Sequence, residues 1–435
     1  PDNIQLGDYP ETLGLQENQT NRALRILELT DGESLLSRDD LLAIKFDKAY
    51  ATGSDADLFI RDVLANDWRG EPEMQAAADH LAGWDYPLDI NDDGDLDLFV
   101  MRVGQNQLQM GTGDCRFARG SELPQRDDWT TAYTAWWQDD ALVMAVGNYV
   151  DRANPDGPFG ACDDNYLLRA GQGDYFATPL TPGYCPLSML AANDARGRPT
   201  LRISNDRHYY VRGGHEQMWD IAEQRFLGPD DGWQNVSLWG MGIASRDLTG
   251  DGFDEVMLTS MGDQLMQIAQ TDGTYAPAPF GIGTYAQRPH TGDDGRPSTG
   301  WHAEFADVDN DARPDLFIAK GNVDQMPGLA MRDPNNLLMQ EADGTFVETA
   351  STAGVATTDR SRGAAFADVD GDGRLDLVVM NRRAKMELYR NITADTGNWL
   401  QIELSQMSSN NRAIGATVIV RYGERSLWHR PSSAR

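Results

Sequence analysis

Short apolar runs recur along the chain, and a loop rich in aspartate precedes each of the clearest ones. Loop 368–376 shows the pattern best, with Asp at positions 1, 3, 5 and 9 and Gly at position 6. The apolar run Leu377–Met380 follows at once and predicts a short buried β-strand. Side chains spaced two apart can converge on one point, and the glycine permits the sharp turn that lets a loop close around an ion.

The same pattern occurs three more times, in loops 89–97, 247–255 and 307–315. In loop 307–315, Ala312 stands where the other loops have glycine, which puts its tight turn in question. The apolar runs that follow these loops are Leu98–Val100, Val256–Leu258 and Leu316–Ile318. Four acidic loops with the same downstream strand indicate oxygen-rich sites for a hard cation such as Ca²⁺, which takes about six to eight oxygen ligands.

An EF-hand loop begins with a similar spacing of Asp and Asn, but it needs a Glu at position 12 and a helix on each side. Position 12 of the four loops falls inside apolar, β-rich runs and holds Val100, Leu258, Ile318 and Val379. The pattern therefore excludes an EF-hand and predicts a cation loop between two β-strands.

Alignment on the apolar strand recovers three weaker copies between the four clear ones. Only Asp57 remains in the first of them, Asp139 and Asp140 in the second, and Asp194 with Gly197 in the third. The seven copies begin near residues 49, 89, 135, 192, 247, 307 and 368. Their spacing of about 40 to 60 residues is typical of propeller blades with four short strands each. We expect an all-β, seven-bladed β-propeller, with an open solenoid of β-hairpins as the alternative.

Three regions follow from this pattern. Residues 1–40 form an N-terminal extension in which Asn21–Leu29 is either a helix or an edge strand, and residues 41–395 form the propeller. In residues 396–435, two apolar stretches, Gly397–Leu404 and Gly415–Val420, predict strands. This pair either closes the ring or begins a small appended β-module that is truncated here.

The charge balance narrows the range of partners. The formal net charge is −31 at pH 7, which disfavours nucleic acid and anionic lipid surfaces. No run of eighteen apolar residues is present, so no membrane span is expected. Because the chain begins at Pro1 instead of Met, we expect it to have been processed or trimmed.

Three cysteines are present, and none forms a C-x-x-C pair that would indicate zinc or redox chemistry. Cys162 and Cys185 flank a segment of hairpin size and are expected to form a disulfide, which leaves Cys115 over. The alternative is that all three are reduced and buried. Disulfides and calcium sites both favour an extracellular or periplasmic location.

Taken together, the four loops and their strands resemble the FG-GAP/VCBS repeats of integrin α-chain propellers and many secreted bacterial proteins. The tail, with Gly397–Leu404 and the later stretch Ser409–Val418, resembles the ASPIC/UnbV module. The combination is similar to bacterial members of the cartilage acidic protein 1 family. This resemblance implies an exported propeller that holds Ca²⁺ in its blade loops and acts in adhesion or recognition.

The resemblance also implies the metal ligands. Side-chain ligands come from positions 1, 3, 5 and 9, and a backbone carbonyl near position 7 adds one more. The side-chain set is Asp89, Asn91, Asp93, Asp97, Asp247, Thr249, Asp251, Glu255, Asp307, Asp309, Asp311, Asp315, Asp368, Asp370, Asp372 and Asp376, and the carbonyl set is Asp95, Phe253, Arg313 and Arg374. Thr249 and Glu255 make the geometry of loop 247–255 the least regular. Mg²⁺ is disfavoured because its octahedral demand suits a flexible loop poorly.

A second kind of site is an alternative. His208, His302 and Glu304 stand near the ends of predicted inner strands and could bind a second, non-calcium metal or act as acid and base in a central channel. The plainer interpretation is that Trp, His and Tyr side chains pack between blades with their polar atoms satisfied by backbone.

The expected function is therefore a calcium-binding recognition or adhesion module with a protein or glycan partner on one rim. A metal-dependent enzyme or biosynthetic protein using the channel site is the alternative, and a purely structural role for calcium is a third. The sequence does not identify the ligand or the oligomeric state.

Overall fold

The computed structural model describes residues 97–430 apart from short gaps, and all of them belong to the second of the two units into which the chain divides, Ala82–Arg435. The gaps are 113–115, 125, 139–140, 151–160, 171–174, 207–213, 263, 286–298, 323–331, 395, 407–409, 411 and 423–424. The extension 1–40, the repeat copy near residue 49 and Cys115 lie outside the described residues.

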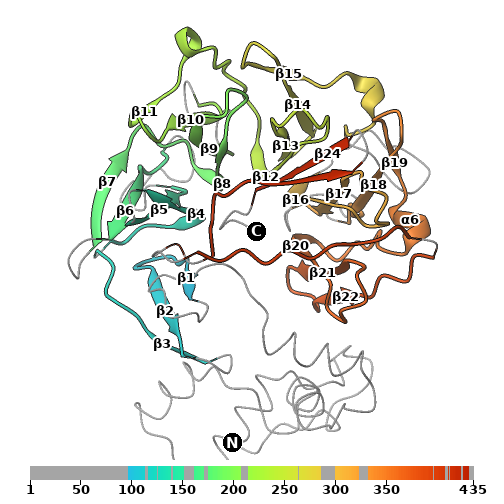
Figure 1. Ribbon diagram of the computed structural model, residues 1–435. Coiled ribbons are helices and arrows are strands. Elements are labelled where there is room, and N and C mark those ends of the chain that lie inside the picture. Colours follow the sequence, from blue (N-terminus) through green and yellow to red (C-terminus); the bar gives the residue numbers. More distant parts are fainter. Residues whose placement is uncertain are drawn as a thin grey trace, which may run out of the picture. The chain divides into compact units, whose positions relative to one another are not determined.

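Six antiparallel sheets stand around a common centre, each formed by consecutive strands (Figure 1). The first three sheets contain β1 (Leu98–Val100), β2 (Gln107–Gly111) and β3 (Phe117–Arg119); β4 (Thr130–Gln138), β5 (Ala141–Asn148), β6 (Asn165–Ala170) and β7 (Tyr175–Leu180); and β8 (Pro186–Asn193), β9 (Pro199–Asn205), β10 (Gln217–Asp220) and β11 (Arg225–Phe226). The next three contain β12 (Gly240–Arg246), β13 (Glu255–Ser260), β14 (Leu265–Ala269) and β15 (Tyr275–Pro277); β16 (Gly300–Ala306), β17 (Asp315–Lys320), β18 (Asn336–Gln340) and β19 (Phe346–Glu348); and β20 (Ser361–Ala367), β21 (Asp376–Asn381) and β22 (Glu387–Tyr389).

Helical structure among the described residues is confined to short turns. These are η3 (Pro229–Asp231), η4 (Phe280–Ile282) and α6 (Ala350–Ala353). No helix in the described part of the chain is long and apolar enough to span a bilayer.

The β-propeller expected from the repeats is therefore confirmed, and the open solenoid is wrong. The predicted number of seven blades is also wrong, because the described residues form six. Six of the seven repeat copies correspond to these blades, since the apolar run of each lies in β1, β5, β9, β13, β17 or β21. The surplus copy near residue 49 rested on one aspartate, Asp57, before an apolar triplet, which is too little to define a blade.

Neighbouring blades bury their faces against each other. Met257 and Met266 of the fourth blade pack with Phe305 and Leu316 of the fifth, and Phe317 of the fifth blade packs with the sixth. Between the third and fourth blades the contact is partly polar: the buried Arg202 donates to Gln267 at 2.6 Å. The core is thus a ring of interfaces between sheets, so each blade depends on its neighbours for burial.

A polar side chain is repeated within five of the blades. A residue that lies at or near the start of one strand accepts the backbone N–H at or just after the end of the strand before it. The pairs are Asn106 with Arg102, Asn165 with Asn148, Glu216 with Asn205, Gln264 with Ser260 and Asn335 with Lys320, at 2.8–3.0 Å. All five acceptor residues are buried. Each one satisfies a donor at the point where the chain leaves the sheet.

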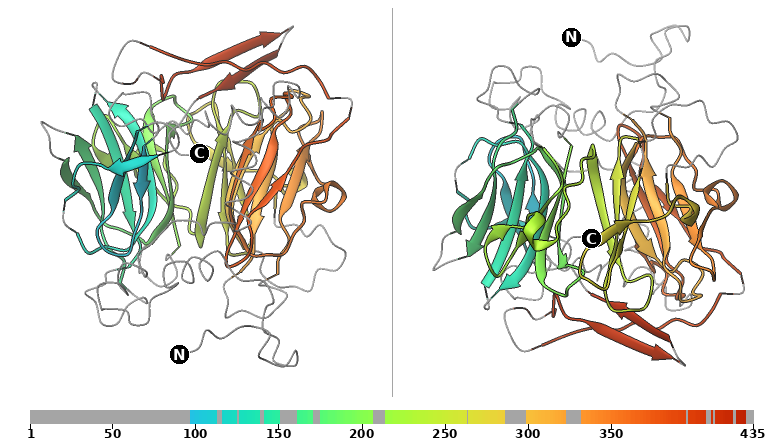
Figure 2. Two further views of the ribbon diagram at one scale, coloured as in Figure 1. Left: turned by 90° about the horizontal axis from the view of Figure 1, so that it is seen from below. Right: turned by 90° about the horizontal axis from the view of Figure 1, so that it is seen from above.

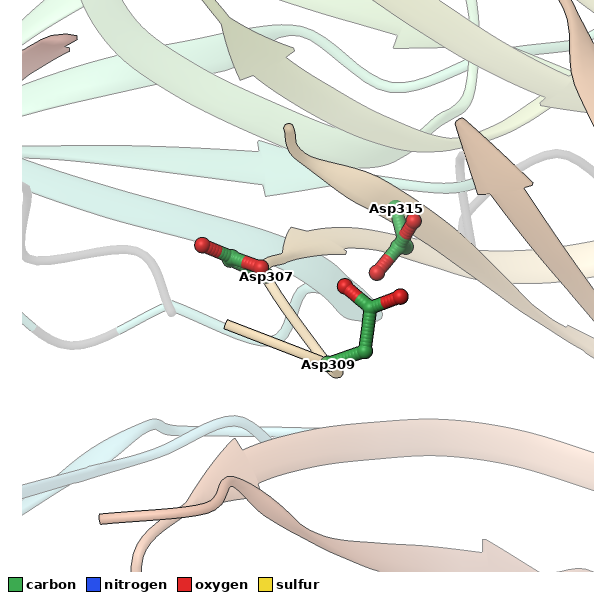
Figure 3. Close-up of side chains that lie close together, drawn as sticks. All are labelled: Asp307, Asp309 and Asp315. Atoms are coloured by element: carbon green, nitrogen blue, oxygen red, sulfur yellow. The ribbon is translucent and has the colours of Figure 1, made fainter. Parts of the chain in front are cut away.

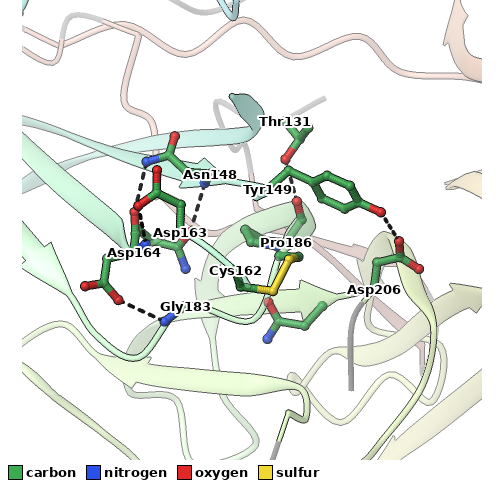
Figure 4. The surroundings of a disulfide bond; sticks show 12 residues. Thr131, Asn148, Tyr149, Cys162, Asp163, Asp164, Gly183, Pro186 and Asp206 are labelled. Carbon is green, nitrogen blue, oxygen red and sulfur yellow. Dashed lines mark hydrogen bonds between the residues drawn. A yellow bond between two sulfur atoms is a disulfide. The ribbon is translucent and has the colours of Figure 1, made fainter. Parts of the chain in front are cut away.

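The predicted disulfide between Cys162 and Cys185 is confirmed, with the two Cα atoms 5.0 Å apart (Figure 4). It links the segment before β6 to the segment before β8, and so joins the second blade to the third. Around it, Asn148 Nδ2 donates to the Asp164 carbonyl at 2.9 Å, and Thr131 donates to the Pro186 carbonyl at 2.6 Å.

The C-terminal segment forms a single two-stranded sheet of β23 (Val418–Tyr422) and β24 (Arg425–His429). This hairpin lies across one end of the blades (Figure 2). The predicted strand Gly397–Leu404 is wrong, since residues 397–404 form no strand, and the Leu400 side chain is 69% exposed. Trp399 there lies against Gly373 of loop 368–376, while Ile402 is 45% exposed, so the apolar pattern did not mark a paired strand.

The repeated side chain gives a test of blade stability. Asn335→Ala removes the acceptor for the buried Lys320 N–H and the Asn335 Nδ2 bond to Thr357 Oγ1 of 3.1 Å. We expect the free energy of unfolding to fall by about 1–3 kcal/mol, measured by urea denaturation, because the buried donor is left unpaired. Glu341→Ala, at an exposed position of the same blade, should leave it within about 0.5 kcal/mol. Equal effects of the two variants would contradict the assignment.

Candidate metal centres

Three of the four acidic loops lie among the described residues, and each connects the first and second strands of a blade. Loop 247–255 joins β12 to β13, loop 307–315 joins β16 to β17, and loop 368–376 joins β20 to β21. In each, the position-9 residue pairs across the hairpin with the residue just before position 1. Equivalent connections of a propeller lie at the same end of the blades, so the three loops share one face. The prediction that they join β-strands is confirmed.

The carboxylate of the position-1 aspartate accepts backbone N–H groups from later positions of its own loop. Asp307 accepts the N–H groups of Asp311 and Ala312, both at 2.9 Å, through its two oxygens. Asp368 accepts those of Asp372 and Gly373 in the same way, at 3.0 and 2.8 Å. The position-1 carboxylate therefore sets the turn through positions 5 and 6.

Position 6 needs a left-handed backbone in every described loop. Gly252 and Gly373 have φ values of 91° and 83°, which glycine adopts without strain. Ala312 has a φ of 66°, so the turn questioned from the sequence forms with alanine as well. The hydrogen bonds from the Asp311 and Ala312 N–H groups to Asp307, with strands β16 and β17 on either side, hold Ala312 in this conformation.

The position-9 carboxylate ties the loop to the third strand of its blade. One oxygen of Asp315 accepts the Val308 N–H at 2.9 Å and the other accepts the Gln340 N–H at 2.8 Å. Asp376 likewise accepts from Val369 at 3.1 Å and Asn391 at 2.7 Å. In the first blade, Asp97 accepts the Gly111 N–H at 2.8 Å. Sequence reasoning assigned these residues to a metal only and missed this second role.

Carboxylate oxygens converge in two of the loops. Asp307, Asp309 and Asp315 each offer an oxygen within 4.8 Å of the others (Figure 3). Asp309 Oδ1 is buried and has no hydrogen-bond partner, so a cation there would satisfy it. Asp368, Asp370 and Asp372 form the second group. These donors are the hard oxygen ligands that Ca²⁺ prefers, and both groups fit such an ion.

Not every predicted ligand joins these groups. Asp311 forms an ion pair with Arg313, and Asp376 stays with its backbone donors. In loop 247–255, Asp251 Oδ1 accepts the Phe253 N–H at 2.9 Å, and the described residues there form no group of three. Of loop 89–97 only Asp97 is described, so Asp89, Asn91, Asp93 and Asp95 lie outside the described residues.

Arginines supply positive charge that the sequence pattern did not anticipate. Arg374, at position 7, pairs with Asp372, and Arg390 pairs with Asp370 from beyond the blade's third strand. These side chains partly neutralise the second group, and a cation entering the loop would have to compete with them. The backbone carbonyl ligands expected at Phe253, Arg313 and Arg374 remain predictions.

Burial and neighbouring carboxylates raise the pKa of several loop carboxyls. Burial, opposed by backbone donors and reinforced by Asp309 and Asp307, raises the pKa of Asp315 to about 7. Burial, with Asp247 and Asp251 nearby, raises the pKa of Glu255 to about 7. The pKa of Asp307 is raised for the same first reason. Such carboxyls resist ionisation unless a cation is present.

The C-terminal segment contacts all three described loops, which sequence reasoning missed. Gly397 N–H donates to the Asp309 carbonyl at 3.4 Å, and Trp399 lies against Gly373. Trp428 lies against Gly252, and Arg430 binds the Asp254 carboxylate and the Gly252 carbonyl. Trp399 and Trp428 in the tail were the available sequence signal.

The alternative site near the channel is only partly described. His302 and Glu304 both lie on β16, with His302 Nε2 and Glu304 Oε2 3.9 Å apart, beyond hydrogen-bond distance. His208 lies outside the described residues. Within the described chain, no third His, Cys, Asp or Glu joins His302 and Glu304 in a group that could hold a metal.

The raised pKa values predict how stability depends on pH when no metal is bound. Asp315 and Glu255 ionise near pH 7 in the fold but near pH 4 in the unfolded chain. Their stabilising contribution is therefore full below about pH 4 and is lost as pH rises through 7. We expect the Tm of chelator-treated protein to fall by several degrees between pH 5 and 8, measured by calorimetry. A Tm that stays level or rises across this window would contradict the carboxyl assignment.

Comparison with known proteins supports the repeat. An FG-GAP-like repeat model matches residues 321–379, a stretch that runs from the end of β17 through loop 368–376 into β21. No curated protein matches the chain. Similar solved structures include BBS1N in complex with ARL6DN, soaked with mercury, at 10% identity over 69% of this chain and 76% of that one, with a TM-score of 0.41. Another is YCF48 bound to D1 peptide, at 8% identity over 70% and 87%, with a TM-score of 0.34. The repeat match and the six blades together support an FG-GAP repeat protein with a β-propeller fold.

Proposed function

We propose that this chain is an exported, calcium-stabilised β-propeller that recognises a protein or glycan partner through one rim. The observation that carries the proposal is the convergence of Asp307, Asp309 and Asp315, with the buried Asp309 Oδ1 left without a partner. Three carboxylates held this close repel each other, and a divalent cation converts the repulsion into attraction. The group Asp368, Asp370 and Asp372 supports the same reading.

Calcium suits these loops better than magnesium. Its coordination accepts an irregular set of carboxylate and carbonyl oxygens, whereas Mg²⁺ demands near-ideal octahedral geometry. We assign side-chain ligands from positions 1, 3, 5 and 9 of all four loops, with loops 307–315 and 368–376 the best formed. Where an arginine pairs with a carboxylate, as Arg313 does with Asp311, the ion would displace it.

The recognition role follows from the scaffold. A propeller holds its loops on rigid strands, and binding residues are commonly found on such loops. The disulfide Cys162–Cys185 supports an oxidising compartment, where calcium is also plentiful. The net charge of −31 disfavours nucleic acid as the partner. The tail's likeness to the ASPIC/UnbV module is consistent with this role.

The enzyme alternative receives less support. Its metal would need His302, Glu304 and a third ligand, and the third predicted residue, His208, is not among the described residues. The separation of 3.9 Å between His302 and Glu304 also gives no hydrogen-bonded acid–base pair.

Calcium binding predicts a stability gain that depends on the loops. Adding calcium to chelator-treated protein at pH 7.5 should raise the Tm by several degrees, since a ligand at 100 times its Kd stabilises by about 2.7 kcal/mol. The gain should be smaller at pH 5, where Asp315 and Glu255 hold protons. Asp309→Asn should weaken the response, whereas Asp343→Asn, in an exposed turn of the same blade, should not. Fewer than two bound calcium ions per chain by elemental analysis would contradict the assignment.

Calcium should also hold the C-terminal segment in place, because Gly397 and Trp399 contact the loops 307–315 and 368–376. We expect calcium to slow hydrogen–deuterium exchange several-fold in residues 397–404 and to leave β5, in a blade that carries none of the four acidic loops, unchanged. Trp399→Ala should abolish the effect on the tail while calcium still raises the Tm. Exchange in the tail that ignores calcium would show that loops and tail are independent.

A further inference from the structure

The second strand of the fifth blade ends in a lysine, where four other blades have asparagine or serine. In these five blades the last residue of the second strand pairs with the first residue of the first strand. The residues at this position are Asn148, Asn205, Ser260, Lys320 and Asn381. The Lys320 side chain has 0% exposure, and lysine is almost never buried this fully without a partner. A short polar side chain serves the fold at the same position elsewhere, so the lysine needs its own explanation.

The strand register places two further reactive side chains on the same face of this blade as the lysine. Strands β17, β18 and β19 are neighbours in the sheet (Figure 1). Ile318 pairs with Asn336, and Leu338 pairs with Glu348. Side chains alternate between the two faces along a strand, so Lys320, Asn336 and Glu348 share one face. Three adjacent strands thus bring together an amine, a carboxamide and a carboxyl group.

The amine is directed at the carboxamide. Lys320 Nζ lies 2.9 Å from Asn336 Oδ1. The distance from Nζ to Asp333 Oδ1 is 3.4 Å, which is longer than the about 2.7–2.9 Å of a charge-assisted hydrogen bond. The amide Nδ2 of Asn336 donates to Glu348 Oε2. The Asn336 side chain is therefore held between an amine on its oxygen and a carboxyl group on its nitrogen.

The surroundings of these groups exclude water. The side chains of Lys320 and Asp333 have 0% exposure, and Asn336 is 1% exposed. Burial raises the pKa of Glu348, so this carboxyl group keeps its proton to a higher pH than an exposed glutamate does. Two groups held in contact in this way react as parts of one molecule, and effective concentrations can reach about 10⁵–10⁸ M. The site therefore has the properties of a reaction centre.

We propose that Lys320 and Asn336 join spontaneously in an isopeptide bond that links β17 to β18. The bond between Nζ and Cγ forms, the bond between Cγ and Nδ2 breaks, and ammonia leaves. An amine and a primary amide thus give a secondary amide and ammonia, with no oxidant or reductant. The product is a covalent link inside the blade that carries loop 307–315. Its formation requires neither calcium nor a partner, so it goes beyond the proposed recognition function.

Asp333 and Glu348 move the protons in this reaction. Asp333 Oδ2 accepts the Thr299 N–H at 3.1 Å, which leaves Oδ1 beside the amine to take the first proton from Lys320. The neutral amine then attacks Cγ, which is one bond beyond Oδ1 and needs only a small movement to come within about 3–3.5 Å. Glu348 protonates the departing Nδ2 and recovers a proton from Nζ. Ammonia takes the proton from Asp333 and leaves as ammonium, so both carboxyl groups return to their starting states.

Mass spectrometry of the full chain tests the bond. After reduction of the disulfide, we expect the main species to be lighter than its sequence by one ammonia. Trypsin cuts after Arg332 and would separate the peptides that contain Lys320 and Asn336, and we expect these peptides to remain joined. Glu348→Gln should restore the full mass and separate the peptides, because it removes the proton donor. Glu341→Gln, at an exposed position of the same blade, should keep the bond.

A second variant distinguishes loss of the bond from loss of the fold. Lys320→Arg keeps a cation beside Asp333 but cannot form the bond, so its peptides should separate while its circular dichroism matches that of the unchanged chain. Full sequence mass with separate peptides in the unchanged chain would overturn the proposal, whether or not any variant folds. So would loss of ammonia with separate peptides, which places the loss at another residue. A cross-link from Lys320 to Asp333, with loss of water, would also overturn it, and a bond that forms unchanged in Glu348→Gln would overturn the role of Glu348.

Discussion

The buried carboxylate at position 9 is the interaction on which the other features of these blades depend. Asp315 holds the Val308 N–H of its own loop with one oxygen and the Gln340 N–H of the third strand with the other. One side chain thus closes the first hairpin and fixes the third strand beside it. Asp376 repeats the arrangement in the sixth blade. Because the carboxylate begins the second strand, it also places the following apolar run, Leu316–Ile318, in the interface between blades.

The same placement creates an electrostatic problem. A carboxylate that is buried to hold backbone donors comes close to the aspartates at positions 1 and 3, and burial with this repulsion raises the pKa of Asp315 to about 7. In the sixth blade, the ion pair between Arg390 and Asp370 neutralises part of this negative charge. In the fifth blade, Asp309 Oδ1 is buried without a hydrogen-bond partner. A bound cation would neutralise the remaining charge and leave the backbone hydrogen bonds of the position-9 carboxylate intact, since each carboxylate oxygen has a second lone pair.

The sequence predicted features that are encoded locally. Each repeat's loop and apolar run lie within about a dozen residues, so the six strands β1, β5, β9, β13, β17 and β21 and the β-propeller class were predicted correctly. Asp57 alone did not distinguish a blade from an apolar triplet, hence the wrong seventh. Nonlocal partners were out of reach: Asn335 acts on Lys320, 15 residues away, and Arg430 acts on Asp254, 176 residues away. The apolar stretch Gly397–Leu404 predicted a strand, but Trp399 contacts loop 368–376 of the sixth blade instead of a neighbouring strand.

The glycine at position 6 shows how one residue serves two requirements. Its positive φ permits the turn, yet Ala312 achieves the same turn, so conformation alone does not demand glycine. Access does. A β-carbon on Gly373 would clash with the indole ring of Trp399, and one on Gly252 would lie 3.2 Å from the ring of Trp428. In the loop that carries Ala312, the tail approaches Asn310 through Gly397, where the missing side chain is on the tail itself. The glycines thus stand where tail and loop meet, which links the shape of each acidic loop to the position of the tail.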